Sequence, residues 1–173
     1  MAFSKLRREI EPRWVSEYVS KFYAKNRVMY RVPLGPIPRE LSELHGTAKA
    51  QKIYRPWRPE VDALIVLPRM IILLEAKIFK WMDGVSKLPV YKGLVPTTPE
   101  LKDLPTEQIL MQLLVVKKMS WVAAAAENVG VEVIEYAPDW ILKIWEERDK
   151  YWTPDAVAQR EARKKKLREL GYV

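Results

Sequence analysis

Cysteine is absent from the 173 residues, and histidine occurs once, at His45. The absence of cysteine excludes disulfide bonds, a thiolate nucleophile, cysteine-bound zinc and iron–sulfur clusters. A single histidine also excludes a metal site built from several imidazoles. Any bound metal must therefore be held mainly by oxygen atoms, and such ligands favour Mg²⁺ or Mn²⁺.

Long uncharged apolar runs are missing as well. A membrane-spanning helix needs roughly eighteen or more such residues in succession, and the sequence offers none, so we expect no membrane span. The N-terminal segment MAFSKLRREIEPRW has neither the apolar core nor the cleavage site of a secretory signal. Both absences favour a cytoplasmic protein.

Basic side chains are in excess, with 30 Lys and Arg against 22 Asp and Glu and a net charge of +8. This balance favours a polyanionic partner, most often a nucleic acid, and DNA is the partner we expect. The alternative is a soluble protein that happens to be basic. Abundant Lys, Glu and Arg, with few Asn and Gln, are also typical of proteins from heat-loving organisms.

Hydrophobic periodicity and turn residues divide the chain into helices and strands. Apolar residues recur at helical spacing from Pro12 to Lys25, and we place Pro12 in the first turn of that helix. The segments 35–59 and 83–105 are rich in turn residues; the first is expected to hold a short helix at 39–44. The other predicted elements are strands at 27–34, 60–67, 70–79 and 131–138, a long helix at 106–130, and helices at 139–152 and 153–173.

This order is α-β-β-β-α-β followed by two further helices. It predicts an α/β fold in which a mixed β-sheet is flanked by helices. The near-continuous Val, Ile and Leu content of the strands at 60–67 and 70–79 indicates that both of their faces are covered. We expect one domain at 1–152 and a separate basic helix at 153–173.

Charged residues interrupt the most apolar segment, EVDALIVLPRMIILLEAKIFKW at 60–81. If its two strands form a hairpin that turns at residues 68–69, Asp62 lies directly opposite Glu75. Opposed residues share a face of the sheet, with Cβ atoms about 4.5–5.5 Å apart. Lys77 shares that face too, because side chains alternate along a strand.

Two carboxylates this close repel each other unless a cation lies between them or one is protonated. A Mg²⁺ or Mn²⁺ ion between Asp62 and Glu75 would resolve this, with water and a phosphate oxygen completing its shell. Lys77 would then orient a water molecule or stabilise charge in a transition state. The structural alternative is a Glu60–Lys77 ion pair, with Asp62 and Glu75 in solvent at the strand ends.

Asp62 on one apolar strand, followed by Glu75, Ala76 and Lys77 at the end of the next, resembles the PD-(D/E)XK nuclease superfamily. The resemblance covers roughly residues 12–136 and includes the α-β-β-β-α-β order, so it implies a restriction-endonuclease-like core. It also implies Mg²⁺-dependent hydrolysis of DNA, with an endonuclease favoured over an exonuclease. Asp62, Glu75 and the backbone carbonyl of Ala76 would bind the metal, and Lys77 would position or activate the attacking water.

Many members of this superfamily carry a further glutamate on the first helix. Glu17 is our candidate for that role and Glu11 the second, with a solvated helix face as the alternative for each. RecB-like members have a Gln-x-x-x-Tyr motif, whereas Gln112 is followed by Val116 at the tyrosine position. The spacing is nearer to that of archaeal Holliday-junction resolvases, which act as dimers, so a homodimer is a further expectation.

Basic and aromatic side chains flank the acidic pair in the sequence. Trp57 and Trp81 either stack on bases or pack in the core, and core packing is favoured. The basic segment REARKKKLREL at 160–170 is a solvated helix, a DNA-binding arm or an assembly element. Four basic residues are expected to contact DNA phosphates: Arg55, Arg58, Lys80 and Lys87.

Three functions are therefore open. The first is a metal-dependent deoxyribonuclease. The second is a DNA-binding or scaffolding protein that retains the nuclease fold without cutting. The third is an unrelated basic α/β nucleic-acid-binding module, which would be favoured if the strand register placed Asp62 and Glu75 on opposite faces of the sheet.

Overall fold

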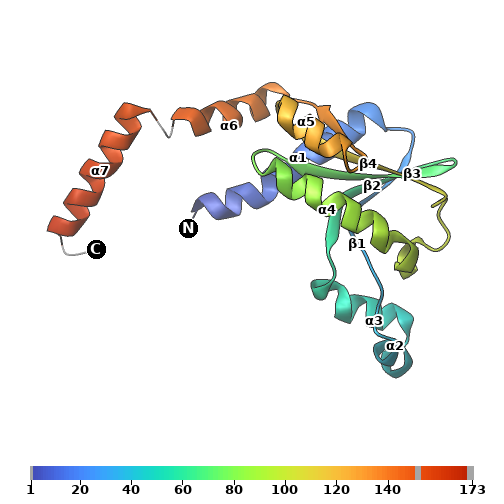
Figure 1. Cartoon of the computed structure of the whole chain (residues 1–173). Helices are drawn as coiled ribbons and strands as arrows, with labels where there is room; N and C mark the ends of the chain where they lie inside the picture. Colours follow the sequence, from blue (N-terminus) through green and yellow to red (C-terminus); the bar gives the residue numbers. More distant parts are fainter. Residues whose placement is uncertain (1, 151–152, 171–173) are drawn as a thin grey trace. The chain divides into compact units, whose positions relative to one another are not determined.

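The computed structural model describes residues 2–150 and 153–170, with side chains for 10–147 and 153–170. The chain forms two compact units, Met1–Tyr136 and Ala137–Val173. The first unit contains the whole sheet and every residue of the expected metal site (Figure 1). This division falls before the helix at 139–150, whereas the sequence analysis assigned that helix to the N-terminal domain.

A five-stranded mixed sheet forms the centre of the first unit, with strand order β1-β2-β3-β4-β5. The first three strands pair antiparallel, and the last three pair parallel. The predicted α/β class is therefore confirmed. The strands are β1 (Arg27–Pro33), β2 (Glu60–Leu67), β3 (Met70–Lys77), β4 (Gln108–Val115) and β5 (Val131–Glu135).

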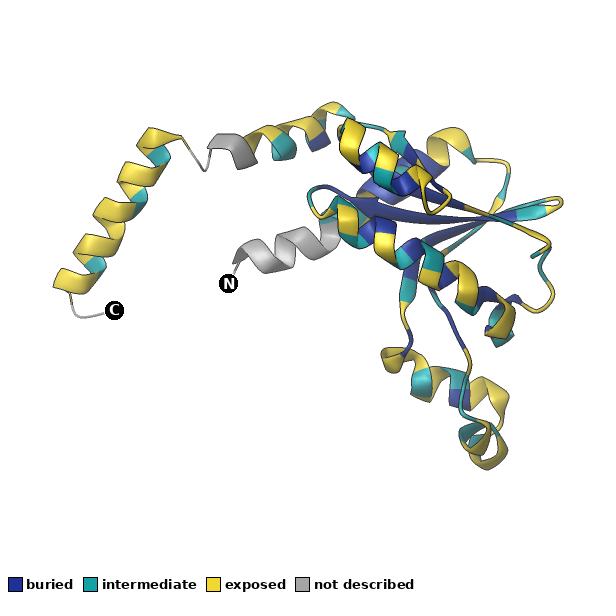
Figure 2. Cartoon of the chain, viewed as in Figure 1, coloured by how far each residue is buried: buried dark blue, intermediate teal, exposed yellow. Residues whose placement is uncertain are grey.

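Helices cover both faces of the sheet. On one face, α4 (Trp81–Leu94) and α5 (Ser120–Glu127) pack on inward side chains of the strands and build the main hydrophobic core. The other face is covered by α1 (Ala2–Phe22). Its residues Trp14, Val15, Tyr18 and Val19 are buried, as the helical spacing predicted, whereas Phe22 is 54% exposed. The buried positions accordingly follow the strands and the inner faces of these helices (Figure 2).

An insertion between β1 and β2 extends away from the sheet (Figure 1). It contains α2 (Arg39–His45), α3 (Thr47–Tyr54) and the short 3₁₀ helix η1 (Arg55–Trp57). The expected helix at 39–44 is confirmed, and the sequence analysis missed α3. Ala50 is the one buried residue of the two helices, so most of the insertion faces solvent.

The expectation of irregular chain at 83–105 is wrong. Residues 81–94 form α4, and two 3₁₀ helices follow, η2 (Val95–Thr97) and η3 (Pro99–Leu101). The sequence did not predict this helix because three of its residues lower helix propensity, namely Gly84, Pro89 and Gly93. Gly84 has a packing role: a Cβ there would lie 2.4 Å from Leu113 Cδ1, so only glycine lets α4 approach β4 this closely.

The expectation of one long helix at 106–130 is also wrong, because this segment contains β4 and then α5. β4 lies between two parallel neighbours, and its residues 111–115 are buried. Such a strand is apolar without alternation, and periodicity alone cannot distinguish it from a buried helix. Pro12, expected in the first turn of its helix, lies inside α1.

The second unit contains α6 (Asp139–Lys150) and α7 (Pro154–Glu169). Thr153 caps α7, because its hydroxyl accepts a 3.4 Å hydrogen bond from the Ala156 N–H. No residue of α7 is buried. Within the part of the chain that the structure describes, no helix has both the length and the apolarity needed to cross a membrane.

Candidate active site

The β2–β3 hairpin has the register that the sequence predicted. Its paired positions run from Leu67–Met70 to Ala63–Leu74, which makes Asp62 and Glu75 the next opposed residues. Beyond Ala63 the next hydrogen bond between the two strands involves a side chain: Asp62 Oδ2 accepts a 2.9 Å hydrogen bond from the Ala76 N–H. The two carboxylates therefore lie on one face of the sheet, at its edge where β3 ends.

Lys77 lies between these carboxylates. Its Nζ atom is 2.9 Å from Glu75 Oε1 and 3.9 Å from Asp62 Oδ2, and it donates a 3.0 Å hydrogen bond to the Ala76 carbonyl. The structural alternative is not observed, because Glu60 pairs with Arg31 and Arg55 instead of Lys77. Glu75 is not in solvent either, since its side chain is 3% exposed.

Glu75 is the electrostatically unusual member of this cluster. Burial is the main cause that raises its pKa, to about 7, and the neighbouring Asp62 charge raises it further, while Lys77 opposes both. Its Oε2 atom is buried and has no hydrogen-bond partner. A buried carboxylate oxygen without a partner is costly, so this position favours a proton or a bound cation.

Lys77 is held in its charged form. Burial alone lowers the pKa of its ammonium group, but the carboxylates of Glu75, Asp62 and Glu11 outweigh this and raise the pKa above its ordinary value. At neutral pH the side chain is therefore a hydrogen-bond donor and a positive charge, not a base.

The first helix supplies a glutamate to this cluster, and it is Glu11. Its Oε2 atom lies 3.8 Å from Lys77 Nζ, and its Oε1 atom accepts a 3.4 Å hydrogen bond from the Ile78 N–H. Glu17, the first candidate, instead accepts a 2.9 Å hydrogen bond from the Tyr136 hydroxyl. Glu17 follows Glu11 by six positions, which advances α1 by about 9 Å and turns it by about 240°, so both cannot face one site.

Two of the expected phosphate-binding residues are arginines in the segment just before β2. Arg58 is buried and is used inside the protein, where its guanidinium binds the Glu100 carboxylate at 2.6 and 2.8 Å and the carbonyls of Pro33 and Gly35. This position corrects the expectation that Arg58 contacts DNA. Arg55 is half exposed, and its Nε atom lies 2.8 Å from Glu60 Oε1.

The two expected lysines lie at or on α4. Lys80 is exposed at the N-terminal end of that helix, and Lys87 is part-exposed and pairs with Asp83 at 2.9 Å. Trp81 is partly buried against the core, as favoured. Trp57 does not pack in the core, because 70% of its surface is exposed.

Sequence reasoning missed two relevant positions and placed a third on the wrong type of element. Arg31, on β1, lies opposite Asp62 on β2, and only the β1–β2 pairing could have identified it. Tyr91 is buried on α4, where burial first and then the charges of Glu75 and Asp62 raise the pKa of its hydroxyl; its segment was taken as irregular. Gln112 lies on β4 and binds Tyr23 and Glu132, and so does not reach the site from a helix.

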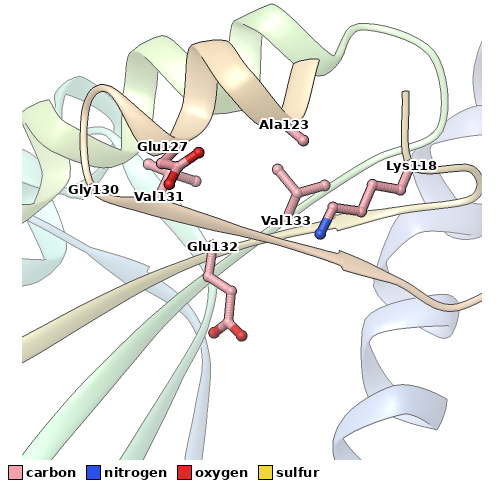
Figure 3. Close-up of a pocket in the computed structure, with 7 residues that line it drawn as sticks. All are labelled: Lys118, Ala123, Glu127, Gly130, Val131, Glu132 and Val133. Atoms are coloured by element: carbon pink, nitrogen blue, oxygen red, sulfur yellow. The ribbon is translucent and has the colours of Figure 1, made fainter. Parts of the chain in front are cut away.

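Two hollows mark the surface of the first unit. A cavity of about 160 Å³ adjoins Asp62 and is also lined by Arg31, Tyr30 and residues of α1. A larger and more open hollow of about 430 Å³ lies between α5 and β5 (Figure 3). Glu132 points away from Glu127 across that strand, so the larger hollow does not gather its charged side chains. The chemically relevant hollow is therefore the smaller one.

The donor atoms at the hairpin end suit a hard divalent cation. Asp62, Glu75 and the Ala76 carbonyl offer oxygen ligands only, and Glu75 Oε2 lacks another partner. Among the described residues, no three acidic or histidine side chains already converge as a metal-binding group. Lys77 Nζ occupies the space between the carboxylates, so the residues fit a metal if the ammonium moves aside.

Comparison with known proteins gives little further information. No protein-family model and no curated protein matches the chain. Among solved structures, the chain is similar to a repair endonuclease from Pyrococcus abyssi, with 18% sequence identity and a TM-score of 0.44. The similar region covers 75% of this chain and 47% of the endonuclease chain, about half of its length. Function is therefore inferred from the geometry of the site.

Proposed function

We propose that this protein is a metal-dependent deoxyribonuclease of the PD-(D/E)XK type, acting as an endonuclease. The observation that carries the proposal is the end of the β2–β3 hairpin. There Asp62, Glu75 and Lys77 meet on one face of the sheet, and Glu75 keeps one buried carboxylate oxygen without a partner. This arrangement is costly for a protein that uses it only for stability.

Each residue has a role that follows from its position. Asp62, Glu75 and the Ala76 carbonyl would hold Mg²⁺ or Mn²⁺. The bound metal would act as a Lewis acid toward a phosphate oxygen and lower the pKa of a coordinated water. Lys77 carries a positive charge and would orient the attacking water and stabilise the negative charge that develops on the phosphate.

Glu11 supports this arrangement without being a necessary ligand. Its carboxylate binds the Ile78 N–H and lies near Lys77 Nζ, so it fixes both the end of β3 and the ammonium group. Once a metal neutralises Asp62 and Glu75, Glu11 offers Lys77 another acidic partner. It would thereby keep the ammonium near the reacting phosphate.

DNA is the proposed substrate because of charge as well as site chemistry. The chain carries a net charge of +8, and the basic residues Lys80 and Arg55 lie near the two ends of the hairpin segment that holds the site. Phosphate contacts from such residues would supply most of the affinity and make it depend on salt. A homodimer, which would let an endonuclease cut both strands, stays a proposal that light scattering can test.

A second function has one observation in its favour. Lys77 already forms ion pairs with both carboxylates in this arrangement, and no metal-binding group is preformed among the described residues. A protein that binds DNA without cutting it could use this ion cluster to hold the end of the hairpin. Such a protein would keep the fold and the basic surface but would not respond to divalent metal.

Cleavage assays separate the two functions. Plasmid, linear duplex, single-stranded and four-way-junction DNA would each be incubated with Mg²⁺, Mn²⁺ or EDTA. We expect metal-dependent cutting that falls by at least about a hundredfold in Glu75→Gln and Lys77→Met proteins. Lys118→Met, which changes an exposed lysine at the larger hollow, is the matched control. Binding without cutting on all four substrates would establish the second function.

A further inference from the structure

The insertion between β1 and β2 presents an aromatic ring to solvent. Trp57 is 70% exposed, and its ring stacks on Tyr54 with centroids 6.0 Å apart and planes inclined by 21°. An indole ring that is left exposed beside a second aromatic ring offers a flat apolar contact surface to a partner. One face of the Trp57 ring is supported by Tyr54, which leaves the ring available for one more stacked layer.

Trp57 is held in this exposed position by its neighbours. On one side Arg55 binds Glu60 at 2.8 Å and the Arg31 carbonyl at 2.8 Å. On the other side Arg58 is buried and bound to Glu100. The Arg58 N–H also donates to the Arg55 carbonyl, which closes the turn around the tryptophan. The backbone that carries the ring is therefore held in place before any partner binds, which lowers the entropic cost of binding.

Two arginines connect the turn that carries this ring with the strand pair that carries Asp62: Arg55 bonds to the Arg31 carbonyl, and Arg31 lies opposite Asp62. Arg31 and Arg55 share the single carboxylate of Glu60, so the group carries a net positive charge. The side chain of Arg31 is 71% exposed, and Arg31 lines the same cavity as Asp62. Arg31 also has φ of 51°, a left-handed conformation that costs energy for a side chain of this kind.

The backbone at Arg31 explains how these groups come together. The β1–β2 ladder pairs Tyr30 with Ala63 and Val32 with Val61, so Arg31 lies across from Asp62. Its left-handed conformation turns the carbonyl toward Arg55, and the resulting hydrogen bond ties the insertion to β1. The strain is thus located where the insertion, the arginines and the acidic site meet.

We propose that the insertion binds an unpaired DNA strand and guides it to the hairpin site. Trp57 would stack on one base, while Arg31 and Arg55 would bind the backbone phosphates that lead toward Asp62. Trp57 and Asp62 are five residues apart, so their Cα atoms are separated by at most about 18 Å, a span of a few nucleotides. In a duplex the faces of the bases are already stacked, so an exposed indole ring favours an unpaired one.

This proposal rests on the proposed nuclease function only for the direction in which the strand runs. Binding itself needs no metal and no cleavage. It therefore predicts a preference for single-stranded over duplex DNA in EDTA. As a consequence, a cutting enzyme would act on single-stranded or branched substrates.

The test is fluorescence-anisotropy titration in EDTA with a labelled oligonucleotide, single-stranded or annealed to its complement. We expect tighter binding of the single strand. Trp57→Leu should weaken that binding about tenfold, as for the loss of one stacked base, and Trp57→Phe should restore most of it. Arg31→Asn, which suits the left-handed conformation, and Arg55→Ala should each lower the salt dependence by about one phosphate contact.

Arg39→Ala is the matched control, because Arg39 is an arginine of the same insertion whose side chain is 88% exposed and whose ion-pair partner, Glu43, lies on its own helix. Equal weakening by Arg39→Ala and Arg55→Ala, no loss in Trp57→Leu, or equal affinity for duplex would each overturn the proposal. Trp57-dependent binding without metal-dependent cutting would retain it and reject the nuclease. Cutting that is unaffected by Trp57→Leu would retain the nuclease function and overturn this strand-binding proposal.

Discussion

At the scale of single residues, two carboxylates of similar chemistry differ because their surroundings differ. Asp62 is 30% exposed and accepts a backbone hydrogen bond, whereas Glu75 is buried beside it with one oxygen unpaired. Lys77 is charged because of both. The cluster is therefore a balance of charges, and a change at any one position alters the others.

A comparison of Glu11→Gln with Glu17→Gln tests which glutamate of α1 supports the site. We expect Glu11→Gln to slow cleavage by about tenfold or more, the loss typical of a residue that orients groups at a metal site. Glu17→Gln removes a charge from the same helix but lies beside Tyr136, so its rate should stay within about twofold of the parent. The measurement is the single-turnover rate at saturating metal. A slower Glu17→Gln protein and an unchanged Glu11→Gln protein would reverse the assignment.

Arg58 is a structural residue, so its loss should lower the stability of the protein. The side chain is 2% exposed and bound to Glu100, and breaking a buried ion pair costs about 3 kcal/mol. We expect Arg58→Ala to lower the free energy of unfolding in urea by that amount. Arg55→Ala, which breaks a half-exposed pair, should cost less than about 1 kcal/mol. Equal costs would show that the buried pair does not hold the base of the insertion.

The same ion pair predicts a pH dependence of stability. Burial tends to raise the pKa of Glu100, but its bonds to Arg58 outweigh this and lower the pKa below the ordinary value of about 4.3. A lowered pKa in the folded state means that the stabilisation is present above about pH 4.3 and is lost as the pH falls through the folded value. The unfolding free energies of the parent and Glu100→Gln proteins should therefore converge between pH 6 and pH 3. A constant difference would contradict this.

At the scale of elements, packing overrides local propensity at α4. This helix contains two glycines and a proline, which lower its intrinsic stability, yet it covers the sheet beside the site. At Gly84 an added Cβ would meet Leu113 at 2.4 Å and the stem of Lys77, at its Cγ atom, at 3.2 Å. The absence of a side chain at this position therefore helps to set where the Lys77 ammonium lies.

Substitution of two glycines of α4 by alanine should have opposite effects. Gly84→Ala would crowd the fully buried Leu113, so we expect a destabilisation of about 1–3 kcal/mol and a lower cleavage rate. Gly93 has no atom within 4 Å of an added Cβ, so Gly93→Ala should stabilise the helix by up to about 1 kcal/mol. Thermal unfolding of both proteins provides the measurement. A stabilised Gly84→Ala protein would show that the helix is free to shift.

At the scale of the whole molecule, the carboxylate site lies in one unit, whereas basic side chains are present in both. The first unit holds the sheet, the carboxylates and the insertion. The second holds α7, whose segment 153–173 carries six basic and three acidic side chains and in which no helical residue is buried. A helix without buried residues contributes little to folding but can contribute to the attraction of DNA.

Deletion of residues 153–173 should therefore leave the melting temperature of the first unit nearly unchanged. We expect the affinity for DNA to fall, and the fall to vanish at high salt, because the lost attraction is electrostatic. Differential scanning calorimetry and binding titrations at several salt concentrations measure the two effects. A lower melting temperature would contradict this, because it would show that α7 stabilises the sheet.

Sequence patterns predicted the elements whose signals are local. The strands β1, β2, β3 and β5 and the α/β class follow from runs of Val, Ile and Leu bounded by turn residues. The opposition of Asp62 and Glu75 follows from a tight turn and a side-chain period of two. The segments of α4 and β4 could not be assigned in this way. The glycine in α4 is explained by its packing on β4, and the apolar run in β4 by its place between two strands, and both neighbours are distant in sequence.

The sequence by itself determined the oxygen-rich chemistry of the site, its basic surroundings and the pairing of two carboxylates on one hairpin. The tertiary structure decided which further side chains reach them. Glu11, and not Glu17, lies near Lys77, and Arg58 forms a buried ion pair with Glu100. Arg31 lines the cavity beside Asp62, and Trp57 is exposed. The physical reason is that helix rotation, burial and the pairing of β1 with β2 depend on contacts across the fold, which no local pattern specifies.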